Sequence, residues 1–467
     1  MTQKTFTLQR RIPVGPAYDL IVAGGGPAGC GAALAAARLG AKVLLIEGNG
    51  CLGGMGTSAM VAAWSHLANG RHSVIGGLMR ELLEKMYARG FIAPTYDRSF
   101  WNTSYNRGLG FQAEGYKLIL DETCAEAGVD VRFFTRVIDV HPGKEPGTLA
   151  GLVTHSIEGY TYLPAHTVID ATGDAVVAHL MGVPCREAGR DTPHIMPPTL
   201  VSAHSGINYE VFHRKKQQAC VDQALADGFF SQPDRHVPGL FRSGKTTATL
   251  NAGHVFGMNA LQTESLSEGM RRGRQLAWEY LEFFRRYVPG CERMEMVTTA
   301  AMMGVRESRR IVGEYELDAD DYAARRTFPD QIAIYCKQTD IHVYAPTPEE
   351  YARYQKEFEE ADVLAPGEYY GLPYGILVPR GSKNFWVAGR CVSSDLKVNG
   401  AIRDQPACLM MGEAAGTAAV LSLRNREPAD ALNTERLILQ LRHNGGNLPQ
   451  ATLSPTMTRR PGPSSSS

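Results

Sequence analysis

The chain has 467 residues, 44% of them hydrophobic, so it is long enough for a large core and suggests two domains. Its 48 basic and 48 acidic residues cancel, which argues against a global field that would attract nucleic acid or an anionic membrane. The nine cysteines are scattered singly, with no C-x-x-C pair. This pattern is typical of reduced thiols, and we expect a cytoplasmic protein.

The two ends of the chain carry no folding signal. Arg10-Arg11 resembles a twin-arginine signal, but no apolar stretch follows, so we interpret residues 1–16 as a solvated leader. Residues 446–467 are predicted to be a flexible tail. No apolar run reaches the roughly 18 residues that span a bilayer, so we expect no membrane partner.

The first elements form a strand, a glycine turn and a helix. The apolar run 20–23 predicts a buried parallel strand, and 28–39 is alanine-rich and predicts a helix. Between them Gly24, Gly26 and Gly29 match G-x-G-x-x-G. The first glycine permits the turn, the second lets backbone approach a pyrophosphate, and the third allows helix and strand to pack closely. This order is typical of a site for an adenine dinucleotide.

The next strand strengthens that interpretation. Residues 42–47 are apolar and end in Glu47, an acid placed to bind ribose hydroxyls; the alternative is an ordinary acid at a strand end. The glycine-rich stretch 48–57 follows, and predicts backbone running along a flat cofactor, or else a flexible loop.

The rest of the first half alternates helices and strands. Residues 91–112 are rich in aromatic side chains and predict a loop or cap that lines a pocket. The other expected elements are helices over 76–90 and 116–127, a strand over 129–135, a small antiparallel meander over 137–140, 149–155 and 160–163, and a buried strand over 167–174 that returns to the parallel sheet.

The sequence pattern changes at about residue 185. Helices are predicted over 209–227 and 267–287 within an α+β region that we interpret as a second domain inserted into the first. Residues 239–246 match the P-loop pattern G-x-x-x-x-G-K-T. No strand precedes the match and an extended stretch follows it, so an ATP site is not expected.

The chain then returns to the first domain. Residues 384–390 predict a strand that ends in glycine. A helix is expected from Pro406 to about Leu421, capped by Asp404 or Gln405. Small residues along one side of this helix would allow close packing.

These motifs occur in the order of a glutathione-reductase-type FAD fold. Over residues 17–425 the chain resembles the bacterial FAD-dependent oxidoreductase family. The resemblance rests on the glycine turn with Glu47 and on the motifs at 53–55, 171–174, 304–311, 377–381, 387–390 and 412–416. It implies an α/β fold: a Rossmann-like FAD-binding domain with a parallel sheet and a β-meander (17–184 and 371–445), interrupted by an α+β substrate domain (185–370).

The resemblance also implies FAD and the residues that bind it. The helix from Pro406 would point its N-terminus at the flavin N1–O2 edge, where Arg403 would add positive charge; a surface salt bridge is the other interpretation of Arg403. The expected cofactor-binding residues are Gly24, Gly26, Pro27, Ala28, Gly29, Glu47, Gly48, Gly53, Gly54, Met55, Val137, Thr172, Gly173, Asp174, Gly389, Arg390, Gly400, Ala401 and Ile402.

The candidate catalytic residues are arginines, histidines and a tyrosine. Arg306, Arg309 and Arg310 lie close together and suggest a bound anion, a carboxylate substrate or an ion-pair cluster; we expect Arg309 to face the pocket. The family often has an arginine after the equivalent of Tyr374, where this chain has a glycine, which leaves the substrate class open. The predicted catalytic residues are Arg309, Arg403, His66 and Tyr374; His204 and His254 are further candidate bases, Cys51 and His66 could hold flavin covalently, and no metal site is expected.

The predicted function is that of an FAD-dependent oxidoreductase that takes a hydride from a small organic substrate at the domain interface and passes electrons to oxygen or another acceptor. No second G-x-G-x-x-G is present and Cys51 has no partner at redox-motif spacing, which argues against a built-in NAD(P)H domain and a disulfide reductase. The alternatives are a flavin monooxygenase with an external reductant and a non-redox flavoprotein resembling the thiazole synthases. A homo-oligomer is compatible with the sequence.

Overall fold

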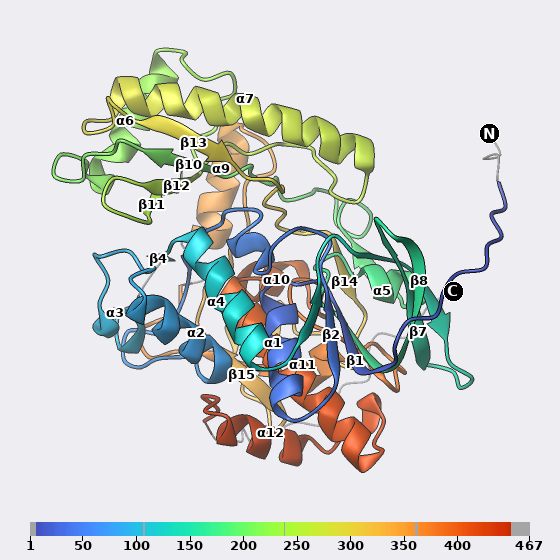
Figure 1. Cartoon of the computed structure of the whole chain (residues 1–467). Coiled ribbons are helices and arrows are strands. Elements are labelled where there is room, and N and C mark those ends of the chain that lie inside the picture. The colour runs from blue at the N-terminus through green and yellow to red at the C-terminus, as the bar shows by residue number, and fades with distance from the viewer. Residues whose placement is uncertain (1–5, 106–107, 238, 360–362, 450–467) are drawn as a thin grey trace.

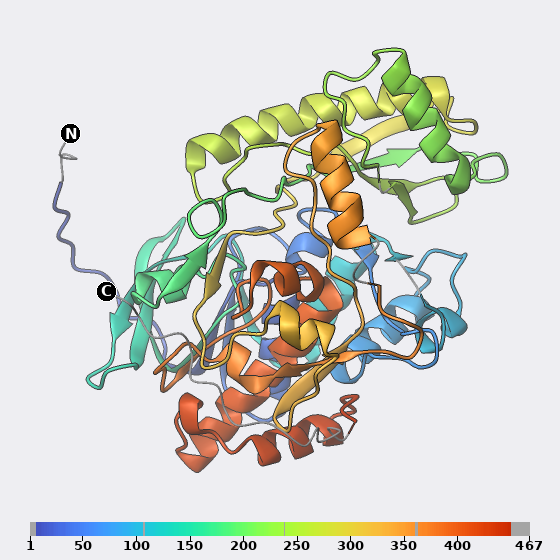
Figure 2. The same cartoon turned by 180° about the vertical axis from the view of Figure 1, so that it is seen from behind.

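The protein consists of a larger sheet domain and a smaller second domain stacked on it (Figures 1 and 2). The computed structural model describes residues 6–105, 108–237, 239–359 and 363–449. In Figure 1 the second domain lies above, and the helix α9 (Pro348–Tyr354) stands between the two domains.

A parallel sheet lies at the centre of the sheet domain. Its strands are β5 (Asp130–Arg132), β2 (Val43–Ile46), β1 (Tyr18–Ala23), β8 (Gly159–Asp170) and β17 (Phe385–Val387), in that spatial order. β1 and β2 are almost wholly buried, as expected of parallel strands covered on both faces. This confirms the predicted α/β sheet.

The strand β8 belongs to two sheets at once. Its first half pairs antiparallel with β7 (Leu149–Ser156), which pairs with β6 (Arg136–Pro142) to form the predicted meander. Its second half pairs with β1 and β17. The sequence predicted two strands here, over 160–163 and 167–174; because Pro164 leaves the extended backbone intact, they are one strand of 12 residues.

Two helices pack against each other beside the sheet at unusually short range. They are α1 (Pro27–Arg38) and α11 (Gln405–Asn425). A Cβ atom on Gly412 would lie 1.9 Å from the Ala28 carbonyl oxygen, and one on Gly416 would lie 2.1 Å from that of Ala32. Only glycine permits this approach, so the predicted narrow side of the second helix is the side that contacts the first.

The remaining helices cover the sheet domain. The buried face of α2 (Gly77–Ala88) contains the predicted Leu78, Leu82, Leu83 and Met86. The other helices are α3 (Arg98–Asn102), α4 (Ala113–Glu126), α5 (Val176–Leu180), α8 (Ala319–Ala323), α10 (Leu396–Ile402) and α12 (Thr434–His443). Two short strands, β3 (Ala63–Trp64) and β4 (Leu109–Gly110), pair with each other.

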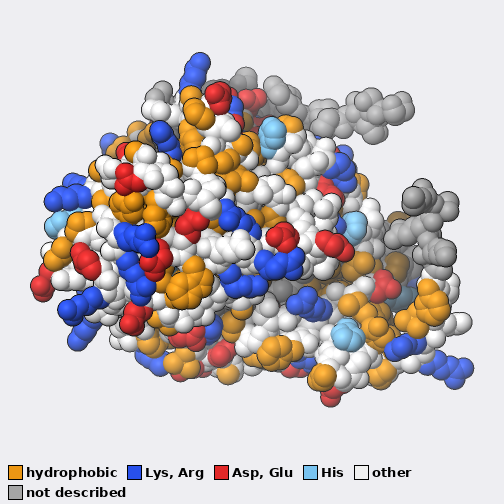
Figure 3. Space-filling view, turned by 90° about the horizontal axis from the view of Figure 1, so that it is seen from above, with side chains coloured by type: hydrophobic (Ala, Val, Ile, Leu, Met, Phe, Trp, Pro, Cys, Tyr) orange, Lys and Arg blue, Asp and Glu red, His pale blue; other side chains and the backbone are white. Residues whose placement is uncertain are grey.

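The second domain has its own core. Its antiparallel sheet has the order β11 (Gly239–Arg242), β12 (Ala248–Asn251), β10 (Ser202–Ser205) and β13 (Glu295–Thr299), and the helices are α6 (Gln217–Ala226) and α7 (Thr263–Tyr287). β11 and β12 form a hairpin over the P-loop match, with no helix after it. The face seen from above mixes basic and acidic side chains (Figure 3).

The hydrophobic cores divide the chain at other positions than the predicted 185–370. The second core contains residues between Leu200 and Met303, whereas Leu317 to Leu372 belong to the core of the sheet domain. There β14 (Arg309–Ile311) pairs with β9 (Cys185–Glu187), and β15 (Gln331–Tyr335) pairs with β16 (Tyr370–Pro373). The return to the first domain therefore comes earlier than the sequence indicated.

Among the described residues, one helix, α11, is long and apolar enough to cross a membrane, with a mean hydropathy of 1.3. In this window 89% is buried inside the protein, so it packs as a core helix. All nine cysteines are free thiols.

Candidate functional site

A cavity of about 990 Å³ opens at the carboxyl ends of β1, β8 and β17 and extends to the second domain. This volume is at the upper end of the roughly 300–1,000 Å³ typical of ligand sites. Ligands of open α/β sheets bind at this edge. Of the predicted cofactor residues, the cavity is lined by Gly24, Gly26, Pro27, Ala28, Glu47, Gly48, Gly54, Met55, Val137, Thr172, Gly173, Asp174, Gly389 and Arg390.

The glycines of the first turn divide into two roles. Gly24 has φ +100°, a conformation that favours glycine, and a Cβ on Gly29 would lie 1.7 Å from the Gly24 carbonyl oxygen. These two are needed for the turn itself. Gly26 has an ordinary φ of −70°, and a Cβ there would meet no protein atom within 4 Å. Its missing side chain therefore leaves space for a ligand at the N-terminus of α1, where backbone N–H groups favour phosphate.

Glu47 contacts the glycine turn through its side chain. Its buried carboxylate accepts hydrogen bonds from the backbone N–H of Gly25 at 2.8 Å and from the backbone and side chain of Asn49, each at 2.7 Å. The carboxylate is thus fixed at the cavity edge in an orientation suited to a ligand hydroxyl. The sequence did not identify Asn49, which also lines the cavity.

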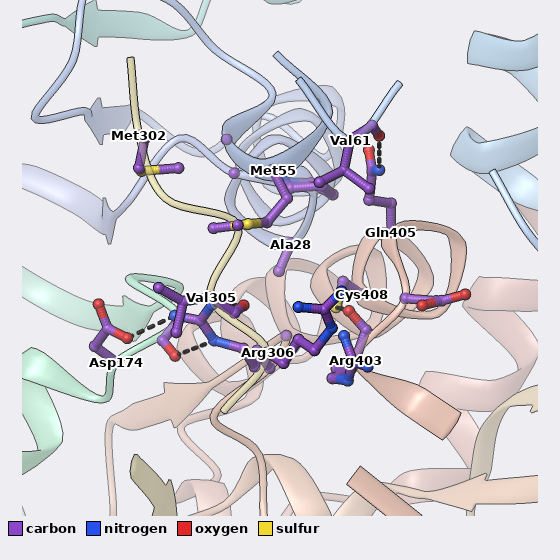
Figure 4. A pocket seen from close by; sticks show the side chains of 18 of the residues that line it. Ala28, Met55, Val61, Asp174, Met302, Val305, Arg306, Arg403, Gln405 and Cys408 are labelled. Atoms are coloured by element: carbon purple, nitrogen blue, oxygen red, sulfur yellow. Dashed lines mark hydrogen bonds and ion pairs between the residues drawn. The ribbon is translucent and has the colours of Figure 1, made fainter. Parts of the chain in front are cut away.

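An ion pair joins the ends of β8 and β17. The Arg390 guanidinium donates to Asp174 Oδ1 at 2.5 Å, to the Gly173 carbonyl at 2.9 Å and to the Val305 carbonyl at 2.5 Å (Figure 4). Ser308 Oγ donates to the same Asp174 oxygen at 2.6 Å. These bonds hold three separate chain segments around one end of the cavity, a role beyond the cofactor contact predicted for Arg390.

Several predicted cofactor residues do not line the cavity. Gly29 lies behind the turn, and Gly53 supports it by donating its N–H to the Gly25 carbonyl at 2.8 Å. Gly400, Ala401 and Ile402 are buried within α10, a helix that the sequence did not predict. Residues 403–405, directly after that helix, line the cavity in their place.

Two predicted catalytic residues are also misplaced. Tyr374 is buried in the core, where its hydroxyl donates to the Ala429 carbonyl at 2.9 Å and accepts from Trp386 Nε1 at 2.8 Å. Arg309 donates to the Asp174 carbonyl and lies 3.6 Å from a Glu187 carboxylate oxygen. Neither residue lines the cavity. Arg306, which precedes β14, lines the cavity instead.

The predicted aromatic cap is wrong as well. Trp101 and Phe111 are fully buried, and Phe111 packs 4.5 Å from the ring of Trp64. The bulk of these rings drives them into the core rather than to the cavity. Residues 106–107 of this stretch lie outside the described residues.

His66 and Arg403 reach the cavity as predicted. His66 Nδ1 lies 3.1 Å from Ser65 Oγ, and the ring is buried. Arg403 donates to the Asp340 carboxylate at 3.0 Å and to its carbonyl at 3.1 Å. Gln405, at the start of α11, donates to the Val61 carbonyl at 2.7 Å and so links the helix end to the chain just after the glycine-rich stretch (Figure 4).

One end of the cavity, its basic end, carries the cations Lys337, Arg306 and Arg403, of which the sequence had singled out the two arginines but not Lys337. Lys337 pairs with Asp340 at 3.0 Å and with Asp404 at 2.8 Å. Arg306, 5% exposed, donates to the Pro197 carbonyl at 2.5 Å and to Thr199 Oγ1 at 3.1 Å. In the described residues Arg306 has no carboxylate at ion-pair distance, and burial, with the charge of Arg403, lowers its pKa to about 9. Figure 4 shows Arg306 and Arg403 extending toward each other.

Three histidines, which sequence reasoning did not group together, also meet at this end. His236, His254 and His342 come from two domains and lie with their ring nitrogens within 4.8 Å of one another. His236 and His342 line the cavity. No metal site was expected because these residues have no ligand spacing along the chain; 88 positions separate the last two. The candidate base His204 lies on β10, away from the cavity.

The residues present fit an adenine dinucleotide. The space beside Gly26, the free end of α1, the fixed carboxylate of Glu47, and Gly54 with Met55 form a cradle along the cavity. The cradle extends to the N-terminus of α11, where Asp404, Gln405 and Cys408 complete the wall.

Solved structures of low similarity align with most of the chain. They include a geranylgeranyl bacteriochlorophyll reductase-like protein from Thermoplasma acidophilum (13% identity, 92% of this chain and 84% of that chain, TM-score 0.44). A myxobacterial chondrochloren halogenase aligns at 16% identity (92% and 79%, TM-score 0.42), and a flavin-dependent brominase at 12% (92% and 83%, TM-score 0.44). A comparison with curated proteins finds no match.

A match to a whole family is more informative. The family profile described as FAD dependent oxidoreductase matches residues 19–441, which include both domains and the whole cradle. The chain therefore belongs to the FAD-dependent oxidoreductase family and is an enzyme with FAD as its cofactor.

Proposed function

We propose that this enzyme oxidises a small organic substrate that carries a carboxylate or a similar anionic group, and that the electrons then pass to oxygen or another acceptor. The observation that carries this proposal is Arg306, a buried cation at the cavity without a carboxylate partner among the described residues. A buried charge is costly unless it is paired, so the geometry favours an anionic ligand at this position. FAD, when bound, supplies the acceptor of a hydride.

The other cations of the basic end are already engaged. Arg403 and Lys337 share Asp340, and Lys337 also pairs with Asp404. Asp340 is held ionised, because Lys337, His342 and Arg403 outweigh its burial and keep its pKa well below the usual range. This network fixes Arg403 next to the position of Arg306. A substrate carboxylate could then bind Arg306 in a bidentate fashion, with Arg403 contributing charge nearby.

The end of α11 adds to the positive potential. Gly416, Gly412 and Pro406 place this helix against α1 with its N-terminus at the cavity. The partial positive charge of a helix N-terminus favours a ligand that gains negative charge, as a flavin does when it is reduced. We expect this end of the cavity to hold the flavin ring, and His66 to act as an acid or base beside the substrate.

The residues that would hold FAD are those that line the cradle. Gly26 and the N-terminus of α1 would bind the pyrophosphate, and Glu47 the ribose hydroxyls. Val137 would contact the adenine through its backbone, and Met55 with Gly54 would lie along the flavin, as the family resemblance implies.

The test is anaerobic reduction of the bound flavin, followed by its absorbance. Small hydroxy acids and amino acids are compared with their amides, which have the same shape without the charge. We expect the acids to bleach the flavin and the amides to fail. The variant Arg306→Met should keep its flavin but lose roughly 100-fold or more in bleaching efficiency, about 2.7 kcal/mol of substrate binding.

The control variant is Arg309→Met, which removes a neighbouring arginine that does not line the cavity. It should bleach as the wild type does. Equal bleaching by acids and amides, or an unchanged Arg306→Met variant, would refute the anionic substrate. Bleaching by NAD(P)H alone would favour the alternative, a flavin monooxygenase; no bleaching by any reductant class would favour a non-redox role resembling that of the thiazole synthases.

A further inference from the structure

The three histidines at the basic end of the cavity are arranged around a common point. The ring centroids of His236 and His254 lie 5.2 Å apart, those of His236 and His342 4.9 Å, and those of His254 and His342 5.0 Å. Three imidazoles bound to one tetrahedral ion at about 2.0–2.1 Å would have their ring centres about 5 Å apart. The observed centroid spacing matches this geometry, and the rings of His236 and His254 are nearly parallel, at 10°.

Two carboxylates lie behind these rings. His254 Nδ1 lies 3.1 Å from Asp234 Oδ2, and His342 Nε2 lies 3.4 Å from Asp340 Oδ1. Metal-binding histidines nearly always donate their outer ring N–H to such a partner, which fixes the tautomer and the orientation of the ring. Asp234 is itself fully buried and held in place by the Tyr351 hydroxyl at 2.7 Å and the His236 backbone N–H at 3.0 Å.

The inner ring nitrogens of His254 and His342 lie close together. If His254 and His342 each give the outer N–H to its carboxylate, the lone pairs of His254 Nε2 and His342 Nδ1 face each other across 2.8 Å. Two lone pairs at that distance repel unless a proton or a metal ion lies between them. A proton needs only these two nitrogens. The third ring, His236, brings another nitrogen to within 4.8 Å, which a shared proton does not explain.

Asp234, which is fully buried, and Asp340 place negative charge behind the rings of His254 and His342, and Asp340 also pairs with Lys337 and Arg403.

We propose that His236, His254 and His342 bind a divalent transition-metal ion of the imidazole-preferring class, such as Zn²⁺, in the wall of the substrate cavity. Asp234 and Asp340 act as positioning residues for His254 and His342. Because His236 and His342 line the cavity, the ion's remaining coordination position lies on the substrate side. This site does not depend on the redox function proposed above, and its occupancy is measured separately from that of the flavin.

The experiment uses the full-length, flavin-loaded protein without an affinity tag. It is stripped with a chelator, reloaded with zinc chloride and gel-filtered, and zinc and flavin per chain are then measured. The wild type should hold one zinc, and His254→Gln should hold none while keeping its flavin. His204→Gln removes an equally buried histidine of the same domain and should keep the zinc. Asp234→Asn should weaken zinc binding by roughly 10- to 100-fold.

X-ray absorption of the zinc-loaded wild type gives a result that does not depend on any variant. We expect imidazole nitrogens at about 2.0–2.1 Å. A wild type that retains no more zinc than His254→Gln would overturn the proposal and leave a shared proton between His254 and His342. A zinc shell dominated by sulfur would overturn it too, since it would place the ion at cysteines.

Discussion

Two glycines of the first turn, Gly26 and Gly29, allow the contribution of the turn to FAD binding to be measured separately from its contribution to folding. Gly26 has an extended, unstrained backbone and open space around its missing Cβ. In the apoprotein, Gly26→Ala should gain about 0.4–1 kcal/mol from the less flexible unfolded chain and lose a similar amount as a poorer helix cap. The free energy of unfolding of the apoprotein should therefore change by less than about 0.5 kcal/mol.

The effect on FAD should be large. The added methyl group projects into the space beside the end of α1, and overpacking there costs about 1–3 kcal/mol. A displaced phosphate also loses one charge-assisted hydrogen bond from the backbone, worth about 1.5–3 kcal/mol. The sum of about 2.5–6 kcal/mol corresponds to a roughly 10²- to 10⁴-fold higher dissociation constant for FAD.

The assay titrates deflavinated protein with FAD and follows the flavin fluorescence, beside thermal unfolding of the same apoproteins. Gly29→Ala is the matched comparison, because its Cβ would lie 1.7 Å from the Gly24 carbonyl oxygen and should destabilise the fold itself. A Gly26→Ala protein that binds FAD within about threefold of the wild type would show that this turn does not hold the pyrophosphate.

Two further predictions concern buried groups of the sheet domain. Burial raises the pKa of Glu413 to about 7 from the usual 4.5, so the stability contributed by its protonated form is fully present below pH 4.5 and is lost as the pH rises through 7. Relative to Glu413→Gln, the wild type should lose up to about 3 kcal/mol of unfolding free energy between pH 4.5 and 8. Parallel pH profiles of the two proteins would contradict this. Tyr374→Phe removes a hydroxyl that makes hydrogen bonds to Ala429 and Trp386, and should lower the free energy of unfolding by about 1–3 kcal/mol in denaturant titrations. Flavin content and turnover should not change. A selective loss of turnover would instead support the catalytic role first expected of Tyr374.

The local parts of the fold were predictable because their physics is local. The glycine turn, the acid at the end of β2 and the alternating strands have short sequence signals, and the structure places them as predicted. The helix α10 was not predicted, because Asn399 and Gly400 are weak helix formers. Its one signal was Asp395, whose carboxylate accepts the Val398 N–H at 2.7 Å as a helix cap.

The basic end of the cavity could not be derived from the sequence. Arg306 and Arg309 lie three positions apart, and only the pairing of β14 with β9 decides which of them faces the cavity. The segment from Lys337 to His342 carries five polar or charged side chains of the site just after the buried strand β15, yet no motif marks it. Its position depends on packing between parts of the chain that are far apart in sequence.

The close contact of α1 with α11 has a consequence for biosynthesis. The carbonyl oxygens of Ala28 and Ala32 meet Gly412 and Gly416, so the first helix to leave the ribosome completes its packing only with one of the last. The strand β17 and the wall at residues 403–405 also emerge late. A nascent chain therefore carries an open, incomplete cradle until nearly its whole length has been translated, and loading with FAD follows translation rather than accompanying it.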